Sequence, residues 1–197
     1  GLDDDGKPTQ PALHLVLGGV PGIDLVLEIY DADQESLIAR YDVRSKGEGE
    51  TAPNLAVPER TTYIKVSAAQ GDNAGAQYVL QAQAVTTDGM EIEPNNTPEK
   101  PTVIATMGDD LKGYLSPRGD RDCFRFEQPQ LTLRYKEAPQ GTTTVSAYDA
   151  TGALYFQRRS GESPLEIPAT AGALTVCLEL TGDVEKSPVA PYFLTPL

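Results

Sequence analysis

The middle of the 197-residue chain carries a group of oxygen-bearing side chains, in the stretch EIEPNNTPEK at residues 91–100. Glu91, Glu93 and Asn95 occupy alternate positions, so an extended backbone would place their side chains on the same side. Carboxylate and amide oxygens are the ligands that Ca²⁺ prefers, and the ion takes about six to eight of them. The alternative is a hydrated linker, because a polar run with prolines is also typical of a domain boundary.

The remaining chemistry-bearing residues do not form a catalytic set. His14 is the sole histidine, and no serine or cysteine nucleophile motif accompanies it, so we expect it to be a solvent-facing strand residue. Asp31 and Asp149 follow similar strands, as the carboxylates of a glycosidase pair could. Each of them, however, begins a hairpin turn, where aspartate commonly caps its own backbone. We therefore expect no enzyme activity in this chain.

The charge of the chain restricts its partners. Lys and Arg number 16 and Asp and Glu number 29, which gives a net charge of −13. Such an acidic chain repels phosphate backbones, so nucleic acid and anionic membrane surfaces are poor candidates as partners, and we expect no nucleic acid to bind. No apolar run reaches the ~20 residues of a membrane span, so we expect no membrane insertion. Calcium is the partner that this charge favours.

Two parts of the chain resemble each other, which indicates an internal duplication. The stretch Leu13–Leu37 is similar to Leu131–Leu154, and the similarity continues in the same order further along both copies. The matched pairs are Leu13 and Leu131, Leu15 and Leu133, Pro21 and Pro139, Leu27 and Val145, Tyr30 and Tyr148, Asp31 and Asp149, Ala32 and Ala150, Pro58 and Pro168, Ile64 and Leu174, Val66 and Val176, Tyr78 and Tyr192, and Leu80 and Leu194.

Apolar residues alternate with polar ones in short runs within each copy, and turn sequences rich in Gly, Pro and Asp separate the runs. This period of two predicts strands with one buried face, and short strands at regular spacing predict β-sandwiches. The predicted fold class is all-β, with two tandem antiparallel, jelly-roll-like β-sandwich domains. We expect a flexible tether over residues 1–11, a first repeat over residues 12–88 and a second repeat over residues 89–197.

The two copies differ at their beginnings. The stretch Pro101–Gln130 precedes the second copy and contains two or three further strand-like runs, whereas only the acidic tether precedes the first. The first repeat is therefore predicted to be partial and to lack N-terminal strands. Its uncovered sheet edge is expected to pair with a strand of another domain or chain, because unpaired edges recruit strands.

The stretches EIEPNNTPEKPTVIA and GYLSPRGDRDCFRF together resemble the opening of the bacterial pre-peptidase C-terminal domain, a small jelly-roll-like sandwich of secreted bacterial proteins. The resemblance covers Glu91–Leu197 well and Ala12–Val85 as a partial copy. It departs from the family pattern at Cys123, where an aromatic residue is common. The matching residues are Glu93, Pro94, Asn95, Asn96, Gly113, Gly119, Asp120, Asp122, Phe124 and Phe126.

The resemblance implies a set of calcium ligands. In the collagen-binding members of the family, which belong to bacterial collagenases, calcium is held between an E-x-E-x-N segment and the aspartates of a G-D-x-D loop. The two acidic patches of this chain would then converge on one ion, which would neutralise their mutual repulsion. The implied metal ligands are Glu91, Glu93, Asn95, Asn96, Asp120 and Asp122.

Cys123 and Cys177 are the two cysteines of the chain, and each lies beside apolar residues of a predicted strand. Alternation places both on the strand face opposite to those apolar neighbours. A disulfide between them would suit a secreted protein. Two unrelated free thiols are the alternative, because the distance between the two Cα atoms cannot be read from the sequence.

These observations predict a non-catalytic module of a secreted or surface protein, located outside the cell, on its surface or in the periplasm. It would act as a spacer, adhesion or accessory domain stabilised by calcium. The alternative is a module that binds carbohydrate or collagen-like ligands, with an extracellular protein or polysaccharide as partner. That function would need exposed aromatic residues, and the candidates are Tyr135, Tyr148 and Tyr155.

Overall fold

The computed structural model describes residues 12–56, 61–85, 89–104, 107–116, 119–136, 142–159, 164–181 and 190–197. The predicted tether at residues 1–11 and the matched residues Pro58 and Pro139 lie outside these ranges. The chain divides into two compact units, Gly1–Asp88 and Gly89–Leu197, and the division falls at the boundary expected from the sequence. We refer to them as unit 1 and unit 2.

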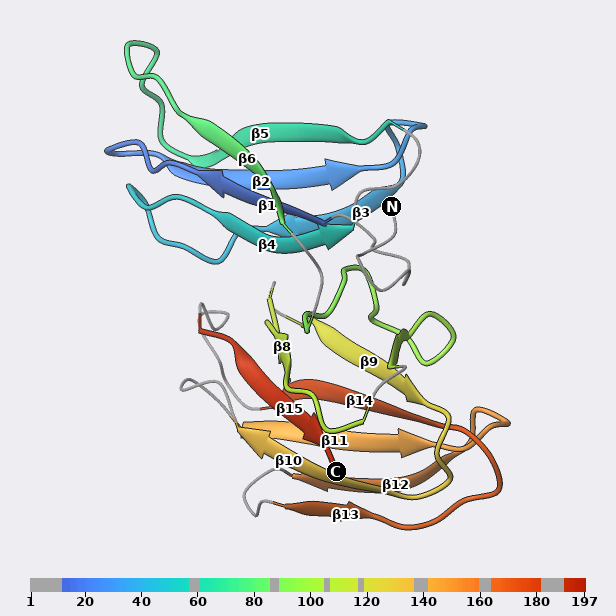
Figure 1. Ribbon diagram of the computed structural model, residues 1–197. Helices are drawn as coiled ribbons and strands as arrows, with labels where there is room; N and C mark the ends of the chain where they lie inside the picture. Colours follow the sequence, from blue (N-terminus) through green and yellow to red (C-terminus); the bar gives the residue numbers. More distant parts are fainter. Residues whose placement is uncertain are drawn as a thin grey trace. The chain divides into compact units, whose positions relative to one another are not determined.

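Unit 1 consists of two three-stranded antiparallel sheets, with strand orders β4-β1-β6 and β3-β2-β5 (Figure 1). Its strands are β1 (Ala12–Leu17), β2 (Asp24–Tyr30), β3 (Leu37–Tyr41), β4 (Thr51–Ala56), β5 (Tyr63–Gln70) and β6 (Leu80–Val85). The core between the sheets is built from the inward side chains of β1 and β2, including Leu15, Leu27 and Ile29. The alternation of the sequence is therefore the pattern that buries one face of each sheet.

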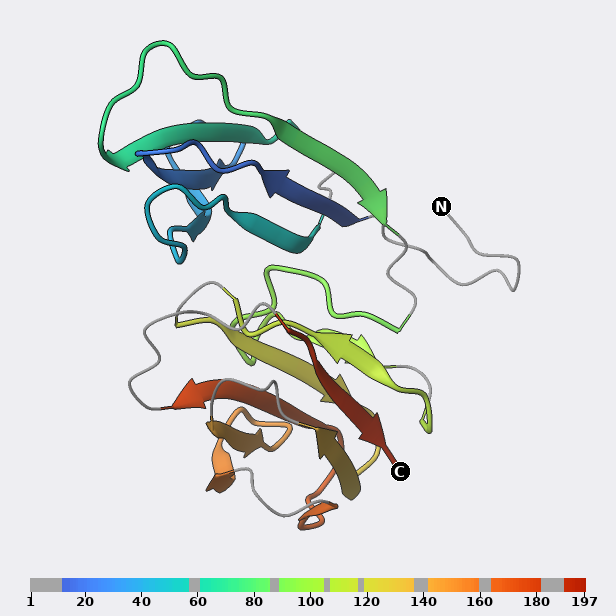
Figure 2. The same cartoon turned by 90° about the vertical axis from the view of Figure 1, so that its left-hand side faces the viewer.

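Unit 2 is a larger sandwich of the same kind, with strand orders β13-β10-β15-β8 and β12-β11-β14-β9-β7 (Figures 1 and 2). Its strands are β7 (Thr102–Ile104), β8 (Leu111–Gly113), β9 (Arg121–Phe126), β10 (Leu131–Lys136), β11 (Thr142–Tyr148), β12 (Leu154–Arg159), β13 (Leu165–Ile167), β14 (Leu174–Thr181) and β15 (Tyr192–Pro196). The all-β fold class is confirmed. The pairing of β7 with β9 is parallel, however, and departs from the purely antiparallel expectation.

The sheet orders confirm the duplication, because β1 to β6 of unit 1 correspond in order to β10, β11, β12, β13, β14 and β15 of unit 2. A register shift also occurs at the same place in both copies, between Ile29 and Tyr30 in β2 and between Ala147 and Tyr148 in β11. These irregularities place Tyr30 and Tyr148 at equivalent positions, as the sequence predicts.

One part of the predicted repeat alignment is wrong by two residues. Ile64 lies opposite Ile29, and the counterpart of Ile29, Ala147, lies opposite Val176. Ile64 therefore corresponds to Val176 and not to Leu174, and Val66 likewise corresponds to Leu178. A shift of two residues keeps every side chain on the same face of the strand, so the alternation of the sequence could not detect it.

The alignment of the closing strands is correct. Leu80 of β6 lies opposite Leu17, and Leu194 of β15 lies opposite Tyr135. Since Leu17 and Tyr135 are equivalent positions of β1 and β10, Leu80 corresponds to Leu194. Two residues before them, Tyr78 corresponds to Tyr192.

Unit 1 has no counterpart of β7, β8 or β9 among its described residues, as expected from the missing sequence. In unit 2, β9 covers the edge of β14, and β8 covers the edge of β15. Within the described part of unit 1, the corresponding strands β5 and β6 are sheet edges. The two units thus share six strands, and unit 2 alone has the segment that contains the acidic cluster.

The residues considered for catalysis have local structural roles. The Asp149 carboxylate accepts hydrogen bonds from the backbone N–H groups of Thr151 and Ala153, which confirms the turn-capping interpretation for this residue. His14 lies in β1 on the face opposite to Leu15 and is half-buried, with its Nδ1 3.0 Å from the carbonyl oxygen of Pro53, so it is only partly exposed to solvent. Among the described residues, no helix has the length and apolar character needed to cross a membrane.

Candidate metal centre

The segment that contains Glu91 runs alongside β8 and is part of the unit 2 sandwich. The Glu91 N–H donates to the carbonyl oxygen of Lys112 at 3.0 Å, and the Lys112 N–H donates to the carbonyl oxygen of Gly89 at 2.8 Å. The side chains of Glu91, Glu93 and Asn95 are all buried. The interpretation of this stretch as a hydrated linker is therefore wrong.

Strand β9 supplies the second acidic patch. Asp122 points inward on β9, on the same face as the core residue Phe124, and Asp120 immediately precedes the strand. The Cys123 N–H donates to the carbonyl oxygen of Asn95 at 3.1 Å, which holds the first segment against the edge of β9. The two acidic patches, well separated in the sequence, thus meet at one end of the unit 2 core.

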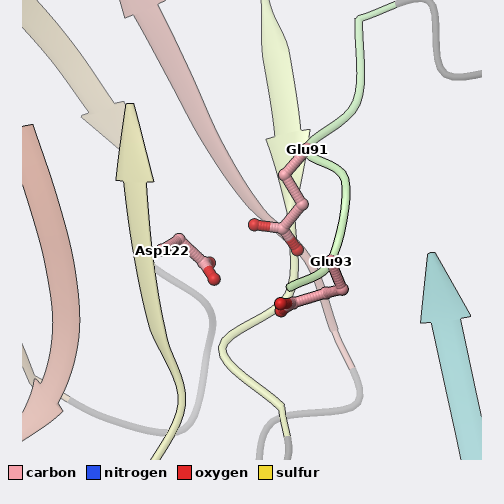
Figure 3. Close-up of side chains that lie close together, drawn as sticks. All are labelled: Glu91, Glu93 and Asp122. Carbon is pink, nitrogen blue, oxygen red and sulfur yellow. The ribbon is translucent and has the colours of Figure 1, made fainter. Parts of the chain in front are cut away.

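The carboxylates of Glu91, Glu93 and Asp122 face one another (Figure 3). One oxygen from each lies within 4.8 Å of the oxygens of the other two. A Ca²⁺ ion bound at its usual oxygen distance of about 2.4 Å can bridge oxygens up to about 4.8 Å apart, so the three carboxylates are close enough to share one ion.

Two of the carboxylates are held in place by hydrogen bonds. Glu91 accepts from the Tyr114 N–H at 2.5 Å and from the Tyr192 hydroxyl at 2.7 Å. Asp120 accepts from the Ser116 N–H at 2.7 Å and the Arg121 N–H at 2.9 Å, and from the Asn96 side-chain amide at 2.9 Å. Asn96 itself is exposed, so its role in the structure is to orient Asp120.

Four buried oxygens of the cluster accept no hydrogen bond from the described residues. They are both carboxylate oxygens of Asp122, Oε1 of Glu93 and Oδ1 of Asn95. Asp122 has no exposed surface and Asn95 is 1% exposed. Buried acceptors without partners are costly and rare in folded proteins, and Glu91, Glu93 and Asp122 are the described residues whose carboxylates could hold a metal ion between them.

Burial and mutual repulsion raise the pKa values of these carboxyl groups. Desolvation is the main cause for Glu93 and for Asp122, whose pKa values lie well above the ordinary range, and the neighbouring carboxylates add to it. Desolvation and the nearby Glu91 charge raise the pKa of Asp120 to about 7. A buried cluster of four carboxyl groups without a cation is therefore driven toward protonation.

Gly113 provides the space in which Glu91 and Tyr192 meet. A Cβ atom at this position would lie 2.2 Å from the Tyr192 ring and hydroxyl and 2.5 Å from Oε2 of Glu91. Tyr192 is fully buried and packs against Phe124 and Tyr135, with ring centroids 6.5 and 5.9 Å apart, so it cannot move aside easily. Only glycine fits this position.

Cys123 and Cys177 form a disulfide between adjacent strands of unit 2, with their Cα atoms 4.1 Å apart. The two residues lie directly opposite each other in the pairing of β9 with β14. The disulfide joins the strand that carries Asp122 to its neighbour in the sheet. The structure thus favours the disulfide over the two free thiols.

The three tyrosines considered for ligand binding do not form an exposed platform. Tyr135 is buried in the unit 2 core, where its hydroxyl lies 2.7 Å from that of Thr143. Tyr148 is hydrogen-bonded to Arg121, and Tyr155 packs against the same core. The prediction that Tyr135 is exposed is wrong, and its alternation with Leu131 and Leu133 already indicated an inward position.

The structure brings the six predicted ligand residues together at one end of unit 2. Sequence reasoning missed the groups that support them, which are the hydroxyl of Tyr192 and the backbone N–H groups of Tyr114 and Ser116. No local pattern marks these residues, because they reach the cluster through contacts between strands that are distant in the sequence.

No family model matches the chain, and no curated protein matches it. The structure is similar to the CUB1-EGF-CUB2 domain of human MASP-1/3, at 6% identity and a TM-score of 0.31, over 96% of this chain and 92% of that chain. It is also similar to the CUB1-EGF-CUB2 domains of rat MASP-1, at 6% identity and a TM-score of 0.29, with the same coverage of 96% and 92%.

A third similar structure is the secreted serine protease VesC from Vibrio cholerae, at 9% identity and a TM-score of 0.32, over 95% of this chain and 46% of that chain. At these scores the similarities carry no argument about function. None of the three structures is described as a pre-peptidase C-terminal domain, so the resemblance to that family stays a prediction.

Proposed function

We propose that unit 2 is a calcium-binding β-sandwich, in which the ion ties the segment around Glu91 to β9 and stabilises a non-catalytic spacer, adhesion or accessory module. One observation carries the proposal. Asp122 and Glu93, which are grouped with Glu91, have buried carboxylate oxygens that accept no hydrogen bond from the described residues, and no positively charged side chain is seen to pair with this group among those residues. Bound calcium would supply the missing positive charge and the missing partner for each oxygen.

The donor set favours calcium over other metals. Every candidate ligand atom is a carboxylate or amide oxygen, and hard cations bind such oxygens, whereas zinc and copper sites in proteins usually include imidazole or thiolate. Both cysteines are committed to the disulfide, and His14 belongs to unit 1. Asp122, Glu93 and Asn95 would hold the ion directly, with Glu91 oriented beside them by Tyr114 and Tyr192.

The proposed location is an oxidising, calcium-containing compartment outside the cytoplasm. The disulfide between Cys123 and Cys177 supports this location, because disulfides form and persist in exported proteins and are rare in the cytosol. Millimolar calcium outside the cell would suffice for a weak structural site.

Titrating calcium into chelator-treated protein is expected to raise the melting temperature of unit 2. An ion that binds only the folded state at about 100 times its dissociation constant adds ~2.7 kcal/mol, which corresponds to a shift of roughly 10 °C or more for a domain of this size. Scanning calorimetry and isothermal titration of the full chain measure both effects. Magnesium should give a smaller shift, and the absence of heat and of any shift at millimolar calcium would remove the proposal.

Without calcium, the stability of unit 2 should fall as the pH rises from about 4 to 8. The folded-state pKa of Asp120 is raised from 3.8 to about 7, and those of Glu93 and Asp122 are raised as well. A raised carboxyl pKa contributes stability below the unfolded-state value and loses it as the pH passes the folded-state value. For Asp120 alone this loss is on the order of 4 kcal/mol.

Saturating calcium should reverse this pH dependence, because the ion binds the ionised carboxylates and competes with protons. Calorimetric melting at several pH values, once in chelator and once in calcium, measures how the melting temperature depends on pH in each condition. A melting temperature in chelator that rises steadily with pH would show that the cluster is not repulsive when empty of metal.

A further inference from the structure

One face of unit 2 gathers positive charge in a chain that is otherwise acidic. Arg134 and Lys136 of β10 alternate with buried residues, so both point away from the core, and both are exposed. Lys112 of β8 lies between two buried residues and likewise points outward, where it is partly exposed. Among the ion pairs of the described residues, none involves any of these three cations.

The two lysines flank an aromatic side chain of the inner strand β15. Phe193 lies opposite Lys136 of β10 on one side and opposite Lys112 of β8 on the other. The Lys136 Nζ is 5.7 Å from the centroid of the Phe193 ring. The Lys112 Nζ is 5.2 Å from the centroid of the Tyr114 ring. We call this surface the basic face, and it consists of Lys112, Tyr114, Arg134, Lys136 and Phe193.

Two acidic neighbours of the basic face stand at one end of it. Asp110 precedes β8 and accepts a hydrogen bond from the Thr195 hydroxyl at 2.5 Å, in the row of Arg134. Glu166 of β13 lies one row further along the sheet, opposite Thr132. The row formed by the two lysines and the phenylalanine contains no carboxylate among the described residues. The two ammonium groups in this row are therefore open to an anion.

Unit 1 forms the same kind of sheet without charge at the corresponding positions. Strands β1 and β6 of unit 1 align with β10 and β15 of unit 2, so each residue of the basic face on these two strands has a counterpart. The counterparts of Arg134, Lys136 and Phe193 are Val16, Gly18 and Val79. Because one copy folds with uncharged residues there, folding does not account for the cations, whereas binding of an anionic ligand does.

The basic face suits a linear ligand better than a folded protein. A protein partner of standard size engages about 20–30 residues on each side, which is far more than the basic face offers. Strands β10 and β15 are paired on both sides within their sheet, so a peptide cannot add to them as a further strand. A chain of sugars needs only cations for its acidic groups and apolar surface for its rings, and the lysine stems and Phe193 supply that surface.

The spacing of the two lysines indicates which polymer fits. Neighbouring strands lie ~4.8 Å apart, so the backbones at Lys136 and Lys112, which are two strands apart, are separated by ~9.6 Å. This separation is about the length of a disaccharide and matches an acidic group on every second sugar. Double-stranded DNA carries one charge every ~1.7 Å, so the rest of this acidic chain repels it far more strongly than it repels such a polymer.

We propose that the basic face of unit 2 binds an acidic polysaccharide in which a uronic acid alternates with a neutral sugar. Lys136 and Lys112 bind successive carboxylates, and the Phe193 ring between them contacts the neutral sugar. Arg134 donates hydrogen bonds to the adjoining part of the polymer. None of these residues is a candidate metal ligand, so the proposal holds whether or not unit 2 binds calcium.

A short hyaluronan oligosaccharide, in which glucuronate alternates with N-acetylglucosamine, is the probe. Titrated into the full chain at constant calcium and low salt, it should shift the backbone amide NMR signals of β8, β10 and β15. The same oligosaccharide with its carboxyl groups reduced to alcohols should not bind. Added salt should weaken the binding of the acidic form, because the contacts are exposed to solvent.

Replacing Arg134 and Lys136 together by glutamine should weaken binding by ~5- to 30-fold, since each exposed ion pair contributes ~2- to 5-fold. Both side chains are exposed, so the melting temperature of this variant should equal that of the parent chain. The matched control combines Lys100→Gln with Arg159→Gln. It also removes one lysine and one arginine, both exposed and both outside the basic face, and should leave the affinity unchanged.

Four results would overturn the proposal. Equal losses in the two double variants would show that general charge, rather than the basic face, attracts the oligosaccharide. No binding, or equal binding of the carboxyl-reduced form, would remove the acidic polysaccharide as the ligand. Amide shifts outside β8, β10 and β15 would place the binding site elsewhere. Tighter binding of a glutamate peptide or of a DNA oligonucleotide to these strands would identify an acidic protein or a nucleic acid as the partner instead.

Discussion

Replacing Asp122 by asparagine is expected to weaken calcium binding by at least ~100-fold, or about 2.7 kcal/mol, because ligand-supporting groups alone account for 10- to 100-fold at metal sites. Both oxygens of the Asp122 carboxylate are buried and lack a hydrogen bond of good geometry to the described residues, so a bound cation would be their main partner. Isothermal titration of the full chain with calcium measures the loss.

The same substitution is expected to stabilise unit 2 in the presence of chelator. Asparagine has nearly the shape of aspartate but carries no charge, so it removes one member of a buried, mutually repulsive cluster. Opposite effects with and without calcium distinguish a metal ligand from an ordinary structural residue, which would destabilise both states when replaced.

Glu127→Gln serves as the matched control for Asp122→Asn. This carboxylate also lies in unit 2, at the end of β9, but its side chain is 65% exposed and contacts only Arg125 among the described ion pairs. Glu127→Gln changes the net charge by the same amount as Asp122→Asn, and the calcium affinity of this variant should equal that of the parent chain. An equal loss of affinity in both variants would mean that general charge, rather than the buried cluster, attracts the ion.

Replacing Gly113 by alanine should have the largest effect on stability. The added Cβ would overlap the ring of Tyr192 and approach Oε2 of Glu91, and both neighbours are buried. Overpacking of a core usually costs ~1–3 kcal/mol, and we expect the upper end or more, because the clash involves a rigid ring and a charged group. Chemical denaturation monitored by hydrogen exchange in β9 and β14 would measure the loss.

The clash with Tyr192 can be separated from other effects of the substitution. In a Tyr192→Leu background the shorter side chain leaves room for a methyl group, so Gly113→Ala should cost much less there than in the parent chain. Gly75→Ala in unit 1 is the control, because the nearest atom to its Cβ is 3.7 Å away. Additive losses for Gly113→Ala and Tyr192→Leu would contradict a direct contact between the two residues.

Local patterns predicted the strands and the duplication well, because alternation and turn residues act over a few residues. The six candidate ligand residues could also be named, because the resemblance to the pre-peptidase C-terminal domain implies them. The exposed Tyr135 was a wrong prediction even though its alternation with Leu133 indicated burial. The two-residue error at Ile64 shows the limit of alternation, which is unchanged by such a shift.

The sequence by itself determined which segments alternate, how often the fold is repeated and which residue types could bind a hard cation. The tertiary structure alone decided that Glu91 belongs to a sandwich core rather than to a linker, and that the Tyr192 hydroxyl and the backbone N–H of Tyr114 hold its carboxylate. The reason is physical: burial, repulsion between carboxylates and strand pairing depend on atoms that are distant in the chain and become neighbours only when the sheets assemble.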